Sequence, residues 1–293
     1  MPLPLERRAL KNGPPPSVRP AGHHWPVSGN KSGNAMPQEA MPRNAFKRAI
    51  HAGRQQIGLW CSIPSPFTVE VLAGSGFDWL LLDTEHAPAD IPEIFAQLQA
   101  AAGGSASPVV RVPSNDPVAI KRALDAGAQS LLMPMVQTAE EAHAAVAATR
   151  YPPEGIRGFA GMSRATRFGR VKDYFKQAHD ETCVLVQVES AQALDNLEAI
   201  CAVEGIDGVF IGPGDLSASL GFLDGQGAPE MVKLIEETLR RIVAAGNRPG
   251  ILTADRTLAR RYMAAGSVFT AVDIDLALLV RQTEALAAEF KAG

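Results

Sequence analysis

The stretch Trp79–Ala101, with the sequence WLLLDTEHAPADIPEIFAQLQAA, contains one complete unit of the predicted fold. It begins with a short apolar run, Trp79–Thr84, of the length expected for a buried β-strand. A polar turn follows, and Ile91–Ala101 then places apolar residues at helical spacing. A strand followed by a helix predicts that the next strand pairs in parallel with the first, because the helix carries the chain back along the sheet.

The same alternation extends on both sides of this unit, from Asn44 to the C-terminus. The predicted strands are Ile57–Ser62, Trp79–Thr84, Pro108–Val112, Ser130–Met135, Cys183–Glu189, Gly208–Gly212, Pro249–Leu252 and Val268–Val272. The predicted helices are Asn44–Ala52, Pro66–Ala73, Ile91–Ala101, Pro117–Ala126, Ala139–Ala148, Pro229–Ala245, Arg256–Ala264 and Leu276–Phe290. Eight strand–helix units over roughly 250 residues match the size of a closed (β/α)8 barrel, or TIM barrel, with parallel strands.

An open, doubly wound sheet is the alternative architecture. The strands are continuous apolar runs, as expected for a sheet covered on both faces. No G-x-G-x-x-G motif follows the first strand, which disfavours the dinucleotide-binding version of the open sheet. We therefore predict a barrel domain at residues 43–293, in which Arg150–Asp180 forms a long loop with a short helix near the catalytic mouth.

The N-terminal segment Pro2–Pro42 differs from the rest of the chain. It is rich in Pro, Gly, Ser and Asn and lacks both apolar periodicity and the continuous apolar core of a secretory signal. We predict that residues 1–42 form a disordered or untranslated tail, with Met36 or Met41 as alternative starts. The pair His23-His24 lies in this tail, and we expect it to have no metal-binding role.

The overall composition is that of an ordinary soluble protein. The 293 residues are 46% hydrophobic and carry a formal net charge of −3, which gives no electrostatic footprint for nucleic acid or an anionic membrane. No apolar run is long enough to span a bilayer. Cys61, Cys183 and Cys201 have no C-x-x-C spacing, so disulfides and thiolate zinc sites are disfavoured and we expect a cytoplasmic protein.

Ionisable and amide side chains gather where the predicted strands end. In a barrel enzyme the chemistry takes place at the C-terminal ends of the strands. The second strand ends in Asp83-Thr84-Glu85-His86, the third in Arg111, the fifth in Gln187 and Glu189, and the sixth is followed by Asp215. Carboxylates from different strands would meet in one mouth, which predicts a catalytic site there.

Glu189 and Asp215 are the candidate metal ligands. Two carboxylates without a thiolate or a second histidine suit a hard divalent cation such as Mg²⁺ or Mn²⁺, whereas zinc usually takes more nitrogen or sulfur ligands. Alternatively, each carboxylate caps the helix that follows it.

His86 and Arg111 are the candidate proton-transfer and anion-binding groups. A neutral imidazole moves protons near neutral pH, and a guanidinium binds a carboxylate through two parallel hydrogen bonds. The alternatives are a structural role for His86 and an ion pair between Arg111 and Asp83.

The positions of the lysines bear on the mechanism. A Schiff-base aldolase on this fold needs a lysine inside the barrel. The barrel lysines all lie on predicted helices or in the long loop: Lys47, Lys121, Lys172, Lys176, Lys233 and Lys291. If the chain is an aldolase, a metal must therefore stabilise the enolate.

Four strand-end motifs and one loop motif resemble those of the HpcH/HpaI aldolase family, and especially its 4-hydroxy-2-oxoheptane-1,7-dioate and 2-keto-3-deoxy-sugar-acid aldolases. The motifs are Leu80–Pro88 (LLLDTEHAP), Val109–Arg111 (VVR), Leu131–Val136 (LLMPMV), Arg150–Gly158 (RYPPEGIRG) and Val209–Ser217 (VFIGPGDLS). The resemblance covers about Phe46 to Phe290.

This resemblance implies a divalent-metal-dependent, pyruvate-specific aldolase that uses Mg²⁺, Mn²⁺ or Co²⁺. It implies that Glu189 and Asp215 hold the metal and that Gln187 and the backbone of Gly214 hold pyruvate. Arg111 would stabilise the enolate, and His86 would accept the proton.

The resemblance also implies features that the residue pattern does not give. Asp125, which looks like a solvated surface carboxylate, would pair with His86 of a neighbouring subunit. Trp60 and Leu252 would form walls of the aldehyde pocket. The protein would be a hexamer that exchanges its last helix, Leu276–Phe290, between subunits. Thr84 departs from the glycine common in relatives, and we expect activity to survive this change.

Two other functions compete with this interpretation. A lyase acting on a coenzyme A thioester, of the malyl-CoA or citryl-CoA type, would share the carboxylate and arginine residues and use basic groups for the CoA phosphates. Such basic residues occur in the long loop, at Arg157, Arg164, Arg167 and Arg170. A non-catalytic barrel is disfavoured because both Glu189 and Asp215 are present.

Overall fold

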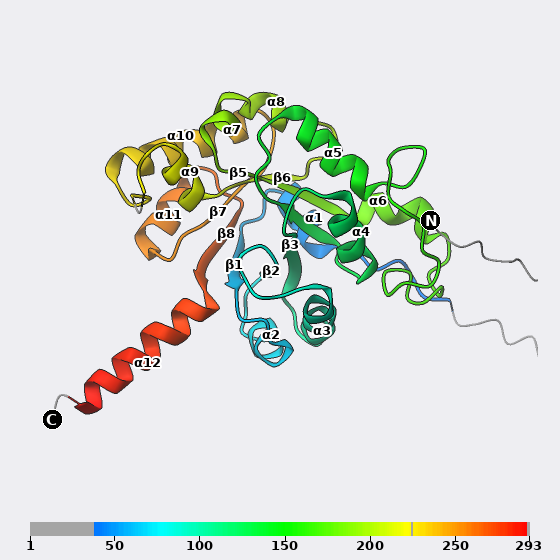
Figure 1. The fold of residues 1–293 in the computed structure, drawn as a ribbon, viewed down its shortest axis with the longest axis horizontal. Coiled ribbons are helices and arrows are strands. Elements are labelled where there is room, and N and C mark those ends of the chain that lie inside the picture. The colour runs from blue at the N-terminus through cyan, green and yellow to red at the C-terminus, as the bar shows by residue number, and fades with distance from the viewer. Residues whose placement is uncertain (1–37, 224, 292–293) are drawn as a thin grey trace, which may run out of the picture. The chain divides into compact units, whose positions relative to one another are not determined.

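Eight parallel strands close into one barrel in chain order, which confirms the predicted fold (Figure 1). A computed structural model of the chain describes residues 38–223 and 225–291. The strands are β1 (Gln56–Cys61), β2 (Trp79–Asp83), β3 (Ser107–Arg111), β4 (Ser130–Met133), β5 (Cys183–Val188), β6 (Gly208–Ile211), β7 (Pro249–Leu252) and β8 (Phe269–Ile274). The barrel closes where β1 pairs with β8.

Helices follow the strands around the outside of the barrel. They are α1 (Ala45–His51), α2 (Pro66–Ala73), α3 (Ile91–Ala101), α4 (Pro117–Asp125), α5 (Ala139–Thr149), α6 (Tyr174–Glu181), α7 (Ala191–Asp195), α8 (Leu197–Cys201), α9 (Pro213–Ser219), α10 (Pro229–Ala244), α11 (Arg256–Ala264) and α12 (Asp275–Lys291). The short helices α7 and α8 were not predicted, since each is too brief to show a helical period.

Aromatic side chains fill the N-terminal end of the barrel. Phe46 of α1 is fully buried and packs against Trp79 and Phe269, with ring centroids 5.6 and 5.7 Å away. Trp79 and Phe269 are the first residues of β2 and β8. The helix α1 therefore closes this end of the barrel, and the open space lies at the opposite, C-terminal end.

Several helices begin with a side-chain cap just after a strand. Asp116, the N-cap of α4, accepts hydrogen bonds of 2.9 Å from the backbone N–H groups of Val118 and Ala119. Ser65 and Asp90 cap α2 and α3 in the same way, and each of these three helices has a proline in its first turn. Such caps satisfy N–H groups that have no partner within the helix, which fixes the start of each helix.

The strand ends differ slightly from the predicted ones. The strand β4 ends at Met133 and not at Met135, because Met135 has a positive φ of 53° and cannot continue a strand. Glu189 lies one residue beyond β5, in the loop that follows it. In the part of the chain that the structure describes, no helix is long and apolar enough to cross a membrane.

The predicted tail and long loop meet on one side of the barrel. Most of the predicted tail, including His23-His24 and Met36, lies outside the described residues. At its end, Glu39 donates a backbone hydrogen bond of 3.1 Å to the carbonyl of Arg170, and Pro42 accepts one of 2.7 Å from Gln129. The long loop contains the short helix α6, as predicted. All three cysteines are free and buried.

Candidate active site

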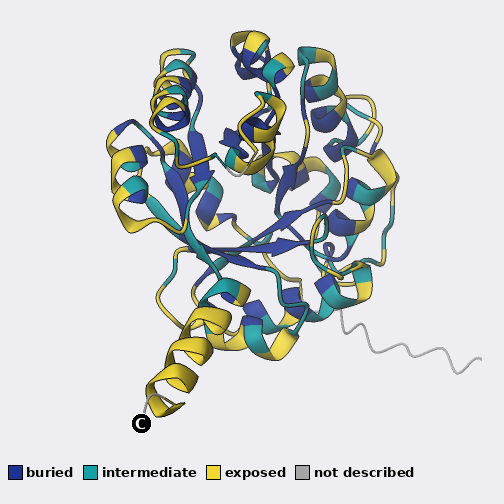
Figure 2. Cartoon of the chain, turned by 60° about the vertical axis from the view of Figure 1, so that its left-hand side comes forward, coloured by how far each residue is buried: buried dark blue, intermediate teal, exposed yellow. Residues whose placement is uncertain are grey.

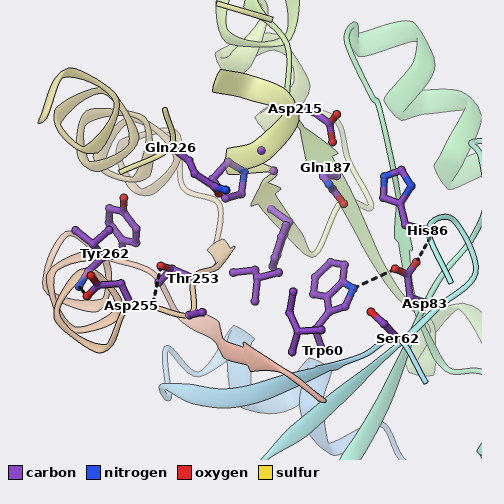
Figure 3. Close-up of a pocket in the computed structure, with 18 of the residues that line it drawn as sticks. Trp60, Ser62, Asp83, His86, Gln187, Asp215, Gln226, Thr253, Asp255 and Tyr262 are labelled. Atoms are coloured by element: carbon purple, nitrogen blue, oxygen red, sulfur yellow. Dashed lines mark hydrogen bonds between the residues drawn. The ribbon is translucent and has the colours of Figure 1, made fainter. Parts of the chain in front are cut away.

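A pocket of about 530 Å³ opens at the C-terminal ends of the strands, as Figure 3 shows. Residues of β1, β2, β3, β5, β6, β7 and β8 and of the segments after several of these strands line it. Its lining includes the predicted residues Trp60, His86, Arg111, Gln187, Gly214, Asp215 and Leu252. The prediction that the C-terminal ends of the strands form the site is therefore confirmed for most of these side chains.

Arg111 is buried and held by two carboxylates. Its Nε and Nη2 donate to the two oxygens of Asp83 at 2.8 and 2.6 Å, and its Nη1 lies 2.7 Å from an oxygen of Glu85. Trp60 donates from Nε1 to Asp83 at 3.1 Å, and the guanidinium lies over the Trp60 ring, 4.7 Å from its centroid. The ion pair with Asp83, one of the two alternatives for Arg111, therefore exists, and Arg111 still reaches the pocket.

The charges in this cluster oppose the effect of burial. Burial alone would raise the pKa of Asp83, but the hydrogen bonds and charge of Arg111 outweigh it and lower that pKa below its usual value. Glu85 differs, since its burial outweighs the lowering effect of Arg111 and, together with the charges of Asp83 and Asp215, raises its pKa.

His86 lies in the loop after β2 and lines the pocket. In Figure 3 its ring lies between the side chains of Asp83 and Asp215. Its backbone N–H is 3.5 Å from an oxygen of Asp83, so the Asp83 carboxylate orders both Arg111 and the loop that carries the imidazole.

Glu189 is buried and does not itself line the pocket, but it contacts Gln187, which does. One of its oxygens accepts a 2.7 Å hydrogen bond from the backbone N–H of Met135, and the other accepts from the side-chain amide of Gln187. Burial raises the pKa of Glu189 to about 7, and the charge of nearby Asp215 adds to the shift. A Cβ on residue 212 would clash with the carboxylate of Glu189 and the amide of Gln187, so only glycine fits there.

These residues fit a hard divalent cation. The Glu189 carboxylate is only 1% exposed and has no Arg, Lys or His partner among the described ion pairs. The side-chain oxygen of Gln187 is buried and accepts no hydrogen bond within the described structure. An acidic, oxygen-lined position without a balancing charge is the environment that Mg²⁺ or Mn²⁺ requires.

The protein itself supplies few ligands at this position. Within residues 38–223 and 225–291, no group of three or more His, Cys, Asp and Glu side chains is arranged to hold a metal. A cation bound by Glu189 and Asp215 would therefore keep coordination positions for water and substrate.

Asp125 lies apart from the pocket within one chain. It is the last residue of α4, and its carboxylate, 26% exposed, accepts a 3.0 Å hydrogen bond from Arg157. Arg157 is fully buried and also lies over the ring of Tyr151. The pairing of Asp125 with a histidine of another subunit stays a prediction.

The basic residues of the long loop do not reach the pocket. Arg157 pairs with Asp125, and Arg164 donates to the backbone carbonyls of Ala126 and Leu98. The described pocket lining contains none of the loop arginines. The structure thus provides no support for a CoA phosphate site at this loop.

The far side of the pocket was missed from the sequence. It includes Gln226, Thr253, Asp255 and Tyr262; Ser62, which lies near Asp83 in Figure 3, was missed as well. Thr253 and Asp255 directly follow β7, so the rule applied to the other strands would have found them. Tyr262 lies within α11, and nothing in the sequence distinguishes it from a core aromatic residue.

Comparison with known proteins gives consistent matches. The family model described as "HpcH/HpaI aldolase/citrate lyase" matches residues 56–282. The chain is 55% identical to the "Pyruvate aldolase" of Rhizobium etli over 250 residues, which cover 85% of this chain and 98% of that protein. It is also 55% identical to the "4-hydroxy-2-oxo-heptane-1,7-dioate aldolase" of Salmonella dublin, over 85% of this chain and 95% of that one.

The fold comparison agrees with the sequence comparison. The structure of an HpcH/HpaI aldolase/citrate lyase family protein from Burkholderia cenocepacia is 40% identical, with a TM-score of 0.82 over 85% of this chain and 99% of that one. The motifs at the strand ends, the closed barrel and the pocket at its C-terminal end all agree with these matches. The chain belongs to the HpcH/HpaI aldolase/citrate lyase family.

Proposed function

We propose that the pocket described above is the active site of a divalent-metal-dependent pyruvate aldolase. The chain is a carbon–carbon lyase that cleaves 4-hydroxy-2-oxo acids into pyruvate and an aldehyde. The observation that carries the mechanism is the buried Glu189 carboxylate, which has no basic partner among the ion pairs of the described residues. It lies beside a pocket that also contains Arg111 and His86.

Glu189 and Asp215 would hold the cation, which is Mg²⁺, Mn²⁺ or Co²⁺. When bound, the metal acts as a Lewis acid that stabilises negative charge on the keto oxygen of the substrate. The described pocket lining contains no lysine, which agrees with a mechanism without a Schiff base.

The other side chains around the pocket bind the substrate, transfer the proton and stabilise the developing charge. Gln187 and the backbone of Gly214 hold the pyruvate portion, and open space adjoins Gly214 on the side where a Cβ would lie. His86 removes the proton from the 4-hydroxyl group of the substrate. The C3–C4 bond then breaks, its electron pair forms the pyruvate enolate, and C4 becomes the aldehyde carbon. Arg111 places a fixed positive charge near this developing negative charge.

Trp60 and Leu252 form apolar walls next to the aldehyde portion. Trp60 is 4% exposed and fixed by its hydrogen bond to Asp83. A rigid wall of this kind orients the substrate before the bond breaks.

The proposed assembly is a homo-hexamer. In it, α12 is exchanged between subunits, and Asp125 pairs with His86 of a neighbouring subunit. The exposed apolar side chains of α12 support this assembly: Leu276, Leu279, Val280, Leu286 and Phe290. Apolar surface of this extent on one helix is typical of an interface.

A chelation experiment tests the metal mechanism. Prolonged treatment with EDTA is expected to abolish aldol formation from pyruvate and an aldehyde, and added Mg²⁺, Mn²⁺ or Co²⁺ is expected to restore it, because two carboxylates bind such ions exchangeably. Product would be identified by mass. Activity that persists after complete chelation, or a pyruvate adduct trapped by borohydride, would overturn this mechanism.

A reassembly experiment tests the role of Asp125. His86→Ala and Asp125→Asn subunits, each inactive alone, should regain activity when mixed, dissociated and reassembled, because some sites would then combine an intact His86 with an intact Asp125. If the subunits are shown to exchange and no activity is recovered, the role of Asp125 at the active site is excluded, and Asp125 is only the partner of Arg157.

A further inference from the structure

The loop after β2, which carries His86, begins with Thr84, a residue to which the proposed mechanism gives no role. Thr84 follows Asp83, which pairs with Arg111 in the register of β2 and β3. Its backbone N–H donates to the carbonyl oxygen of Arg111 at 3.1 Å, and its hydroxyl donates to the same oxygen at 2.6 Å. A carbonyl oxygen has two lone pairs and can accept both hydrogen bonds. Thr84 therefore ties the start of the loop to the end of β3 twice.

The next residue of the loop contacts the side chain of Arg111. An oxygen of Glu85 lies 2.7 Å from Nη1 of Arg111, and the backbone N–H of Glu85 donates to Asp83 at 3.0 Å. Thr84 thus binds the backbone of Arg111 while Glu85 binds its guanidinium. Together these contacts set the loop and the guanidinium in one relative position, and His86 follows directly.

Close packing does not fix this loop from behind. Successive side chains of a strand point to opposite faces, so Val110 and Val112 face away from the barrel mouth into which Arg111 projects. A cavity of about 200 Å³ lies on that outward side, and its lining includes Thr84, Ala89, Val110 and Val112. None of its described lining residues lines the pocket that contains His86. The position of the loop consequently depends on the hydrogen bonds at its start.

From these contacts we infer that Thr84 is a positioning residue, whose hydroxyl holds the loop so that Glu85 and His86 keep their places relative to Arg111. The inference rests on the proposed roles of His86 and Arg111. The hydroxyl acts through the two residues that follow it. A displaced proton acceptor slows the reaction without weakening substrate binding, so loss of the hydroxyl should lower kcat and leave KM nearly unchanged.

Two pairs of variants isolate the hydroxyl. Thr84→Val has the shape of threonine without the hydroxyl, and the backbone N–H still satisfies the carbonyl of Arg111. In cleavage of a 4-hydroxy-2-oxo acid with saturating Mg²⁺, its kcat is expected to be lower by about three- to tenfold, the factor that corresponds to one neutral hydrogen bond. Thr84→Ser retains the hydroxyl and should stay within about twofold of the wild type, whereas Thr84→Ala should lose as much as Thr84→Val.

A matched control separates positioning from stability. Thr238 is fully buried in α10, and its hydroxyl also donates to a backbone carbonyl, that of Leu234, at 2.8 Å. It is absent from the described lining of the pocket. Thr238→Val should lower the melting temperature and leave kcat unchanged. In a Glu85→Ala background, Thr84→Val should lower kcat by a smaller factor than in the wild type, because part of its effect passes through Glu85.

The outcomes distinguish this inference from the proposed function. If the wild type with metal neither cleaves a 4-hydroxy-2-oxo acid nor forms one from pyruvate and an aldehyde, the proposed function fails. If the wild type is active but Thr84→Val and Thr84→Ala change kcat no more than Thr238→Val does, the function stands and the inference is overturned. An effect confined to KM, or a loss in Thr84→Ser equal to that in Thr84→Ala, would overturn it as well.

Discussion

Arg111 shows how a single residue is fixed for catalysis by its neighbours. Asp83 binds it through two hydrogen bonds, Glu85 contacts Nη1, and the Trp60 ring packs against the guanidinium. A flexible side chain thereby keeps one position, and its positive charge needs no reorganisation when the substrate reacts. The same carboxylate, Asp83, also orders the loop that carries His86.

Replacing Asp83 by Asn should affect both stability and turnover. The change leaves the buried Arg111 without its main partner, so the free energy of unfolding should fall by about 2 to 3 kcal/mol, less than for a pair with no other contact because Glu85 remains. Because Arg111 acts on the developing charge, kcat should fall more than KM rises. Urea unfolding and steady-state kinetics measure the two effects, and a change confined to KM would contradict this role.

The pH dependence of stability provides an independent check on Asp83. Its pKa is lower in the folded protein than in the unfolded chain. The ion pair therefore stabilises the protein fully above the unfolded-state pKa, and this contribution is lost as the pH falls towards the lower, folded-state pKa. The unfolding free energy of Asp83→Asn should consequently decline less steeply on acidification than that of the wild type. Parallel declines in both proteins would show that other carboxylates dominate.

Two glycines at the start of α9, Gly212 at its N-cap and Gly214 in its first turn, offer a matched pair of substitutions. In Gly212→Ala, the new methyl group collides with Glu189 and Gln187, so the affinity for Mn²⁺ should fall by about tenfold or more. In Gly214→Ala, the methyl group enters open space, and Mn²⁺ affinity should be retained. Titration with Mn²⁺ measures both. Equal affinities in the two variants would argue against Glu189 as a ligand.

At the scale of elements, α12 differs from every other helix of the described chain. It extends away from the barrel in Figures 1 and 2, and Asp275 is its only buried residue. Asp275 accepts hydrogen bonds from the backbone N–H groups of Ser62 and Ile63, which fixes the start of the helix beside the end of β1. The remainder of α12 presents apolar side chains to solvent in a single chain.

Charged substitutions on α12 should dissociate the proposed oligomer. Leu279→Asp combined with Leu286→Asp places two carboxylates where a neighbouring subunit would pack, and sedimentation velocity should then detect smaller species. Val243→Asp, on the exposed face of α10, introduces a charge at a similarly exposed apolar residue and serves as control. Unchanged sedimentation of the double variant would remove the support that α12 gives to a hexamer.

The elements themselves could largely be predicted from the sequence, because period and end signals are local. The helices α2, α3 and α11 have the predicted bounds, where Ser65, Asp90 and Asp255 provide the caps. The site was predictable as far as strand ends determine it, which located Arg111 and Gln187. Their neighbours were less predictable, since the hydrogen bond between Gln187 and Glu189 and the position of Tyr262 at the pocket depend on tertiary packing.

At the scale of the whole molecule, the barrel brings together residues from almost its entire length. Trp60 comes from β1 and Leu252 from β7, yet both line one pocket because β8 joins these ends of the sheet. The closed sheet thus forms the mouth of the barrel, and the strand ends supply the groups proposed for aldol chemistry.

The pairing of Gln56 on β1 with Phe269 on β8 has a consequence for biosynthesis. On the ribosome, β1 emerges early and β8 close to the end of translation, so the edge of β1 has no partner for most of synthesis. An unpaired edge strand invites pairing with other nascent chains. Chains that terminate prematurely before β8 would retain this open edge, and we expect them to depend on chaperones or to be degraded, even though they already contain every side chain proposed to bind metal and pyruvate.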